Sequence, residues 1–170
     1  MSRAGNLALG VVAAAVVGAG VWWIGFKYPA DQRAAAAAEE AAAAATLREQ
    51  REGMFGAESV APEVQWRETG LGYRVFSEGS GVKPMMGTKV RLMYVGRLKD
   101  GTIFDRTAKP VEFSVGQLIP GMNAALQMLG DGGKGVFFIP PALGYGNRPF
   151  GPIPAKSGLI FEIEVLKVGS

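Results

Sequence analysis

One stretch near the middle of the chain constrains the fold more than any other. Over residues 90–98 an apolar face alternates with a mixed face, which is the period of a half-buried β-strand. Residues 99–101, Lys-Asp-Gly, favour a tight turn because glycine accepts a positive φ at no steric cost. A second apolar run ends in an acid, so Tyr94, Phe104 and Asp105 are predicted to lie close together. One carboxylate beside two aromatic rings indicates a candidate site rather than core packing alone.

The residue types that are missing exclude several kinds of chemistry. The sequence contains no His and no Cys, which excludes His-based triads, Cys nucleophiles and the common zinc sites. The glycine-rich residues 130–135 lack the Ser or Thr and the spacing of a phosphate loop. The net charge of +3 is spread without a basic cluster, which argues against a nucleic-acid partner. We therefore expect no metal and no cofactor, and any catalysis must use aromatic rings, hydroxyls, carboxylates, lysines or the backbone.

The amino-terminal part of the chain is predicted to anchor it in a membrane. Residues 4–26 carry no charge, and a helix over residues 7–26 would span about 30 Å, the thickness of a bilayer core. Trp22 and Trp23 lie at one end of this run, as in an interfacial aromatic belt. The prediction is a transmembrane anchor over residues 1–28 that contacts lipid through residues 4–26. The alternative is a cleaved signal peptide, although the apolar run continues past the small residues where cleavage would occur.

The next segment, residues 29–62, is rich in alanine and low in complexity. Pro29 suits the first turn of a helix, Asp31 suits its positive end, and Gly53 suits its stop. The pattern predicts a helical stalk that ends in a hinge over residues 53–62. The alternative is a helix that packs on a partner within a membrane complex.

The folded domain is predicted to span residues 63–170. Alternating or apolar runs bounded by Gly and Pro indicate strands. The expected strands cover residues 65–69, 73–76, 88–98, 111–115, 136–139 and 158–168. Apolar side chains recur at helical spacing from Met122 to Leu129, with Gly130 as a C-terminal cap. These elements predict an α+β fold in which an antiparallel, strongly twisted sheet is wrapped on one short helix.

Short motifs succeed one another in a fixed order between residues 79 and 168. They are Gly79-x-Gly81-x-x-Pro84, Val90-x-Leu92-x-Tyr94-x-Gly96-x-Leu98, Asp100-Gly101-x-x-Phe104-Asp105, Phe113-x-Val115-Gly116, Leu118-Ile119-x-Gly121, Gly132-Gly133-Lys134, Ile139-Pro140-Pro141-x-Leu143-x-Tyr145-Gly146, Ile153-Pro154 and Leu159-Ile160-Phe161-x-Ile163-x-Val165-Leu166. In this order the chain resembles the FKBP-type peptidyl-prolyl cis–trans isomerases, the macrolide-binding immunophilins. The resemblance implies an antiparallel half-barrel around one helix and an enzyme that assists folding by rotating X–Pro bonds. It also implies proline-containing polypeptides as partners and no cofactor.

The resemblance also assigns roles to residues of this chain. The catalytic positions that it implies are Tyr94, Phe104, Asp105, Ile119, Tyr145 and Phe161. The substrate-binding positions are Leu118, Met122, Ile153, Phe113 and Val111. Aromatic rings would form walls around the proline, Met122 its floor, and the Ile119 N–H and the Tyr145 hydroxyl donors to substrate carbonyls. Asp105 would be a polar group near the twisted amide rather than a proton carrier.

Each assignment has a structural alternative. Phe161 and Phe113 would face inward in any sheet domain, Asp105 would serve as a loop cap, and Leu118 with Ile119 would fix the entry to the helix. The chain also departs from the family's usual pattern. Met122 stands where the family usually has Trp, and Val111 where it often has Phe.

The sequence supports two functions. The first is a membrane-tethered isomerase and chaperone. In that case, substitution of Phe104 or Asp105 is expected to reduce the rate of prolyl isomerisation. The alternative is a structural or accessory subunit of a membrane protein complex, with weak or absent isomerase activity because of its altered residues. A lone N-terminal anchor commonly exports the domain behind it, which favours a bacterial inner membrane with the C-terminal domain in the periplasm. An organelle inner membrane is the alternative location.

Overall fold

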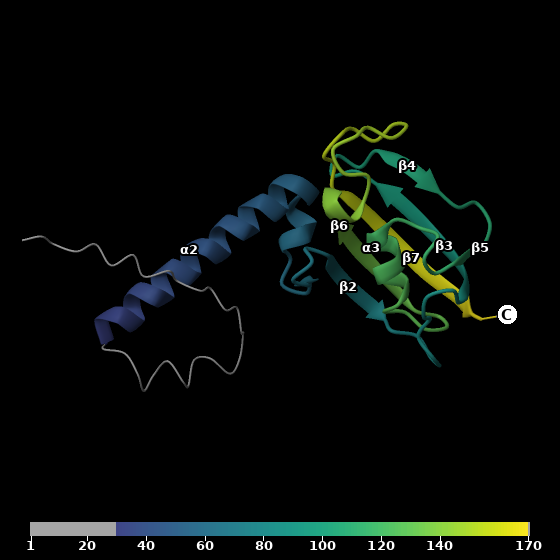
Figure 1. Cartoon of the computed structure of the whole chain (residues 1–170), viewed down its shortest axis with the longest axis horizontal. Helices are drawn as coiled ribbons and strands as arrows, with labels where there is room; N and C mark the ends of the chain where they lie inside the picture. Colours follow the sequence, from purple (N-terminus) through teal and green to yellow (C-terminus); the bar gives the residue numbers. More distant parts are fainter. Residues whose placement is uncertain (1–29, 170) are drawn as a thin grey trace, which may run out of the picture. The chain divides into compact units, whose positions relative to one another are not determined.

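The computed structural model describes residues 30–169 of the chain (Figure 1). In chain order the elements are α2 (Ala30–Phe55), the 3-10 helix η1 (Ala57–Val60), β1 (Gln65–Trp66), β2 (Gly72–Ser77), β3 (Lys89–Arg97), β4 (Ile103–Arg106), β5 (Val111–Ser114), α3 (Pro120–Leu126), β6 (Lys134–Ile139), the 3-10 helix η2 (Pro141–Leu143) and β7 (Leu159–Val168). The anchor predicted for residues 1–28 lies outside the described residues. Within residues 30–169, no helix is both long and apolar enough to cross a membrane.

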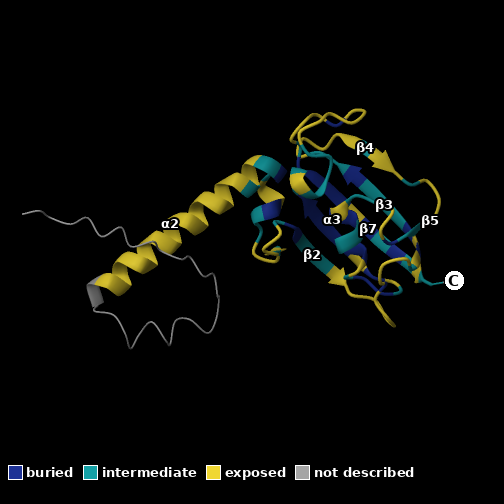
Figure 2. Cartoon of the chain, in the orientation of Figure 1, coloured by how far each residue is buried: buried dark blue, intermediate teal, exposed yellow. Residues whose placement is uncertain are grey.

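The chain divides into two compact units between Ala45 and Thr46. The described part of the first unit is helical and rich in alanine, and residues 32–45 are exposed throughout (Figure 2). Alanine is a strong helix former but offers little apolar area, so a helix can form here without a stripe of large apolar residues to bury.

The second unit is built on an antiparallel sheet, as the alternating patterns predict. The strand order is β1-β2-β6-β7-β3-β4, and β5 also pairs with β3. The long strand β3 carries both short strands on one edge, because β5 pairs with its first half and β4 with its second half. The other edge of β3 pairs with β7 over nearly its whole length. This arrangement confirms the predicted α+β fold with an antiparallel sheet and one short helix.

The main core lies between α3 and one face of this sheet. Met122 and Leu126 of α3 are buried together with Leu92, Phe137 and Phe161 from three strands. The helix is shorter than predicted, since it ends at Leu126.

Tighter turns replace the predicted last turn of α3. The amides of Met128 and Leu129 bond to carbonyls only three residues earlier. Gly130 is not the predicted helix cap, because its N–H donates to the carbonyl oxygen of Glu78 at 2.7 Å.

A second, smaller core covers the opposite face of the sheet. Phe55, at the end of α2, is 3% exposed and packs with Val136, Phe138 and Ile160. The sequence predicts a hinge over residues 53–62, but this apolar contact holds the segment on the sheet.

Candidate functional site

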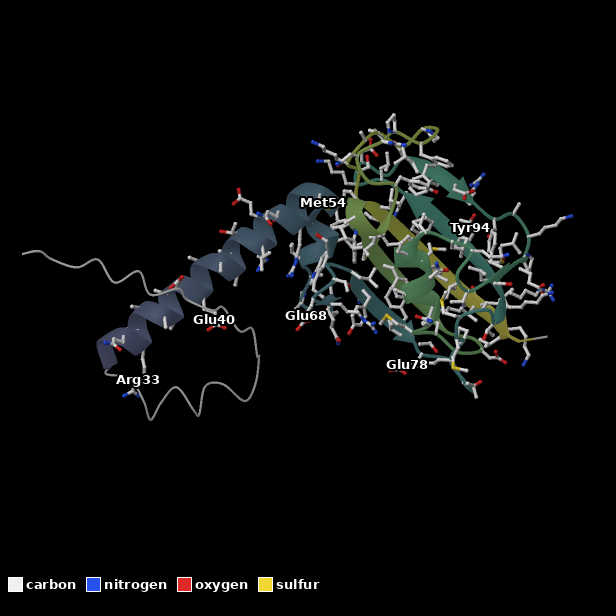
Figure 3. The ribbon with its side chains drawn as sticks, in the orientation of Figure 1. Arg33, Glu40, Met54, Glu68, Glu78 and Tyr94 are labelled. Atoms are coloured by element: carbon white, nitrogen blue, oxygen red, sulfur yellow. The ribbon has the colours of Figure 1, made fainter. Side chains whose placement is uncertain are left out.

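The hairpin of β3 and β4 brings Tyr94 and Asp105 together, as predicted. Gly96 pairs with Asp105 across the ladder, so the Asp105 side chain lies on the face of the sheet that carries Tyr94. Figure 3 labels Tyr94 among the side chains of the sheet unit. The Tyr94 hydroxyl donates to Oδ2 of Asp105 at 2.6 Å. Burial, and then this hydrogen bond, raise the pKa of Tyr94 above its ordinary value. Tyr94 therefore remains a neutral hydroxyl that holds an exposed carboxylate in a fixed direction.

Three aromatic rings meet beside this hydrogen bond. The ring centroid of Phe161 lies 5.9 Å from that of Tyr94 and 5.5 Å from that of Phe104. The Phe104 and Phe161 rings meet edge to face at 81°, a favourable arrangement for aromatic pairs. Gly96 makes room for them, since a Cβ there would lie 2.7 Å from Cε2 of Phe104 and 2.9 Å from Cε1 of Phe161.

The loop between η2 and β7 adds a fourth aromatic residue. Tyr145 lies on a Gly-flanked segment and stacks on Phe150, with ring centroids 4.3 Å apart and planes 5° from parallel. Burial, and then the negative charge of Asp105, raise the pKa of Tyr145. The loop is closed by paired backbone hydrogen bonds between Phe150 and Ile153.

The loop before α3 and the first turn of α3 pack against the same core as the cluster. Met122 is buried to 3% exposure, and Leu118 and Ile119 pack partly buried against the same core. Asn123 fixes this loop, because its Oδ1 accepts the Gly116 N–H at 2.8 Å and its Nδ2 donates to the Leu118 carbonyl at 2.7 Å.

Two donors near this core have no acceptor within residues 30–169. They are the backbone N–H of Ile119 and the hydroxyl of Tyr145. Both remain available to a carbonyl from outside the chain. These are the two donors that the sequence resemblance implies.

The structure gathers the predicted site residues around one core. All of them except Asp105 lie within the main core or pack directly against it. The buried members are Met122, Ile153 and Phe161, and the partly buried members are Tyr94, Phe104, Val111, Phe113, Leu118, Ile119 and Tyr145. Asp105 is exposed and joins the group through Tyr94.

Sequence reasoning missed three residues that shape this cluster. Thr107 accepts the Tyr94 N–H at 3.0 Å, Asn123 ties down the loop before α3, and Phe150 stacks on Tyr145. A polar Asn inside an apolar helical pattern was the one available signal, because such side chains often bond to nearby backbone. Nothing in the sequence pattern marks Thr107 or Phe150.

A separate hollow of about 320 Å³ lies mainly on the opposite face of the sheet. Its lining mixes apolar Met93 and Val95 with charged Glu162, Glu164 and Lys134. Of the predicted site residues, only Tyr94 lines it. In the part of the chain that is described, no three His, Cys, Asp or Glu side chains are grouped so as to hold a metal ion.

Comparison with known proteins gives consistent matches. The family model for FKBP-type peptidyl-prolyl cis-trans isomerase matches residues 80–166. The isomerase FkpA of Aeromonas hydrophila is 37% identical over 120 residues, covering 69% of this chain and 45% of that protein. The outer membrane protein MIP of Legionella longbeachae is 37% identical over 121 residues, covering 69% of this chain and 52% of that protein. This chain therefore spans about half the length of these two curated relatives.

Solved structures give the same result for the fold. A peptidyl-prolyl cis-trans isomerase from Pseudomonas syringae pv. tomato has a TM-score of 0.65 at 32% identity, covering 74% of this chain and 95% of that chain. FkpA from Escherichia coli also has a TM-score of 0.65, at 28% identity, covering 84% of this chain and 74% of that chain.

Proposed function

Because the chain belongs to the family of FKBP-type peptidyl-prolyl cis-trans isomerases, we propose that it rotates X–Pro bonds of polypeptides at the cluster around Tyr94 and Phe161. The observation that carries this proposal is the Tyr94–Asp105 hydrogen bond set beside three aromatic rings and two unused donors. A chain without His or Cys suits the reaction, because no nucleophile and no proton carrier is needed.

The physical task is to stabilise a twisted amide. Rotation about a peptide bond has a barrier of about 18–20 kcal/mol, because the resonance that keeps the amide planar must be lost. The twisted amide has a less dipolar carbonyl than the planar one, so an apolar aromatic surface favours it over the ground state. Hydrogen bonds that fit only the twisted form lower the barrier further.

Each residue of the cluster has a proposed part in this task. The rings of Tyr94, Phe104 and Phe161 hold the proline ring, and buried Met122 lies beneath it. The Ile119 N–H and the Tyr145 hydroxyl donate to carbonyl oxygens of the substrate. Asp105 lies near the twisted amide as a polar group. The remaining proposed contacts to the bound polypeptide come from Leu118, Ile153, Phe113 and Val111.

A prolyl-peptide assay on the full chain tests this proposal. We expect the wild-type protein to accelerate cis-to-trans conversion well above buffer, and Phe104→Ala or Asp105→Leu to lower kcat/KM by about tenfold. Phe76→Ala is the matched control, because this ring is 61% exposed on β2 and lies outside the cluster. Equal rates for wild type and buffer would refute the proposal.

We further propose that the isomerase works while tethered to a membrane. The support is the uncharged run of residues 4–26, long enough to cross a bilayer as a helix, followed by the exposed Ala-rich helix as a spacer. The proposed location is a bacterial inner membrane with the C-terminal domain in the periplasm. Retention of the protein in carbonate-washed membranes tests the anchor, and protection from added protease until the outer membrane is opened tests the side.

The accessory-subunit function remains the second candidate. The presence of Met122 at the floor of the proposed site favours it. An unbranched, flexible thioether is a less rigid floor than the Trp usual in the family. Mild-detergent purification separates the two functions. A stoichiometric complex that persists through size-exclusion chromatography, together with no isomerase activity, would favour the accessory subunit.

A further inference from the structure

The end of α2 is packed on the sheet face opposite α3. The ring of Phe55 is 3% exposed, and its centroid lies 5.7 Å from that of Phe138. Gly158, directly before β7, gives this ring its space, because a Cβ there would lie 2.6 Å from Cε1 of Phe55. The end of α2 therefore lies against the start of the strand that carries Phe161.

Polar contacts join the same region to the β3–β4 hairpin. Arg97 donates from Nη2 to Oε2 of Glu58 at 2.5 Å, and from Nε to Oε1 of Glu162 at 3.3 Å. Lys99, in the hairpin turn, donates to the carbonyl oxygen of Gly53 at 2.9 Å. The Arg97 side chain is only 20% exposed, so solvent and salt screen its two ion pairs less than those of a fully exposed arginine.

Arg97 lies where the β3–β4 ladder changes register. Gly96 pairs with Asp105, but Arg97 pairs with Ile103, so Phe104 is the extra residue on its strand. Such a β-bulge bends the strand and changes the direction of its side chains. The direction of the Phe104 ring and of the Asp105 carboxylate therefore depends on this irregularity.

We propose that Glu58 and Arg97 are positioning residues for the isomerase site. They hold the bulge from the outer face of the sheet and so fix Phe104 and Asp105 on the inner face. Neither side chain touches the aromatic cluster. The kinetic part of this inference rests on the proposed function, whereas the structural part concerns the hairpin alone.

Hydrogen exchange in the full-length Glu58→Gln variant measures the structural part. The amides of Leu98 and Thr107 bond across the hairpin to the carbonyls of Thr102 and Tyr94. We expect their exchange to become about threefold to fivefold faster, the effect of losing one partly screened ion pair. Exchange in the β2–β6 ladder should be unchanged, which separates local positioning from a general loss of stability.

Kinetics of the same variant measure the functional part. We expect kcat toward a prolyl peptide to fall by a similar factor, about threefold to fivefold, with a smaller change in KM. The reason is that the apolar surface that binds the peptide remains, while the residues beside the twisted amide lose their direction.

The matched control is Glu164→Gln. Glu164 pairs with Lys134 at 2.9 Å on the outer face of β7, has a similar exposure to Glu58, and does not contact the bulge. We expect wild-type exchange at Leu98 and Thr107 and wild-type kcat in this control. Wild-type exchange at both amides in Glu58→Gln would overturn the inference. If the wild-type protein has no isomerase activity, the proposed function fails, and hydrogen exchange still decides the positioning role.

Discussion

At the scale of single residues, the aromatic cluster depends on the lack of a Cβ at Gly96. Gly96 leaves space for the rings of Phe104 and Phe161, because a Cβ there would lie within 2.9 Å of both. We expect Gly96→Ala to force at least one ring to move, to lower kcat/KM by about tenfold, and to reduce the free energy of unfolding by about 1–3 kcal/mol. Prolyl-peptide kinetics and urea denaturation measure these two effects.

Gly53 offers the control for this substitution. It lies in the last turns of α2, and a Cβ there would meet no heavy atom of the described residues within 4 Å. We expect Gly53→Ala to raise stability by about 0.5–1 kcal/mol, because alanine favours a helix, and to leave the kinetics unchanged. Equal losses in the two variants would contradict the role given to Gly96.

Tyr94 gives the site a characteristic response to alkali. Burial and the hydrogen bond to Asp105 raise its pKa in the folded protein above the unfolded value of about 10. The neutral phenol therefore stabilises the fold fully below about pH 10, and this contribution is lost as the pH rises through the folded pKa. We expect the thermal midpoint of wild type to fall more steeply above about pH 10 than that of Tyr94→Phe.

Tyr73 provides the comparison for that experiment, because its hydroxyl also makes a hydrogen bond, donating to Gln65 at 2.7 Å. Tyr73→Phe also removes one tyrosine hydroxyl and its hydrogen bond, so it controls for that general effect of Tyr94→Phe. Identical slopes of melting temperature against pH in wild type and Tyr94→Phe would show that Tyr94 does not set the alkaline response.

Whether a contact of the site can be predicted from the sequence depends on how far apart its residues lie along the chain. Tyr94, Phe104 and Asp105 were predicted together because one short turn brings them together. Phe150 and Asn123 were missed because their contacts depend on how two irregular loops fold. The catalytic roles stay predictions until the variants are measured.

At the scale of elements, Asn123 ties the loop before α3 to the helix itself. Its two hydrogen bonds, to the N–H of Gly116 and the carbonyl of Leu118, hold the loop that presents the Ile119 amide. We expect Asn123→Ala to cost about 1–3 kcal/mol of stability, and to lower kcat/KM because the donor loses its place. Gln127→Ala, at the exposed residue directly after α3, should change stability by less than about 0.5 kcal/mol.

The end of α2 should contribute strongly to the stability of the sheet domain. Phe55 is 3% exposed among Phe138, Trp66 and Ile160. We expect Phe55→Ala to lower the free energy of unfolding by about 3–5 kcal/mol, because it leaves a cavity. Leu47→Ala, at a side chain that is 48% exposed, is the control. Calorimetric midpoints that match in the two variants would contradict the docking of this helix end.

Sequence patterns predicted the elements better than their ends. Period-two alternation indicates the strands. Apolar spacing predicts a helix as far as Leu129, because it cannot tell an α-helical turn from the tighter turns found there. The local pattern predicts a hinge around Phe55, because its partner Phe138 lies far along the chain and the pattern carries no information about that contact.

At the scale of the whole molecule, the order of strands is the least local feature. The last strand, β7, lies between β6 and β3. It therefore joins the β1-β2-β6 part of the sheet to the part built on β3. Periodicity predicts an antiparallel sheet and a short helix, but it carries no information about the order of the strands in the sheet. The membrane anchor concerns residues outside the described part of the chain and stays a prediction.

The central claim is that this chain rotates X–Pro bonds at the Tyr94–Asp105 cluster. Exchange NMR on a Leu-Pro peptide tests it most directly, because it observes cis and trans forms interconverting without a coupled protease. We predict exchange cross-peaks between the two forms with catalytic amounts of the full-length protein, and much weaker ones with Asp105→Leu. Interconversion as slow as in buffer, on the scale of tens to hundreds of seconds, would contradict the claim.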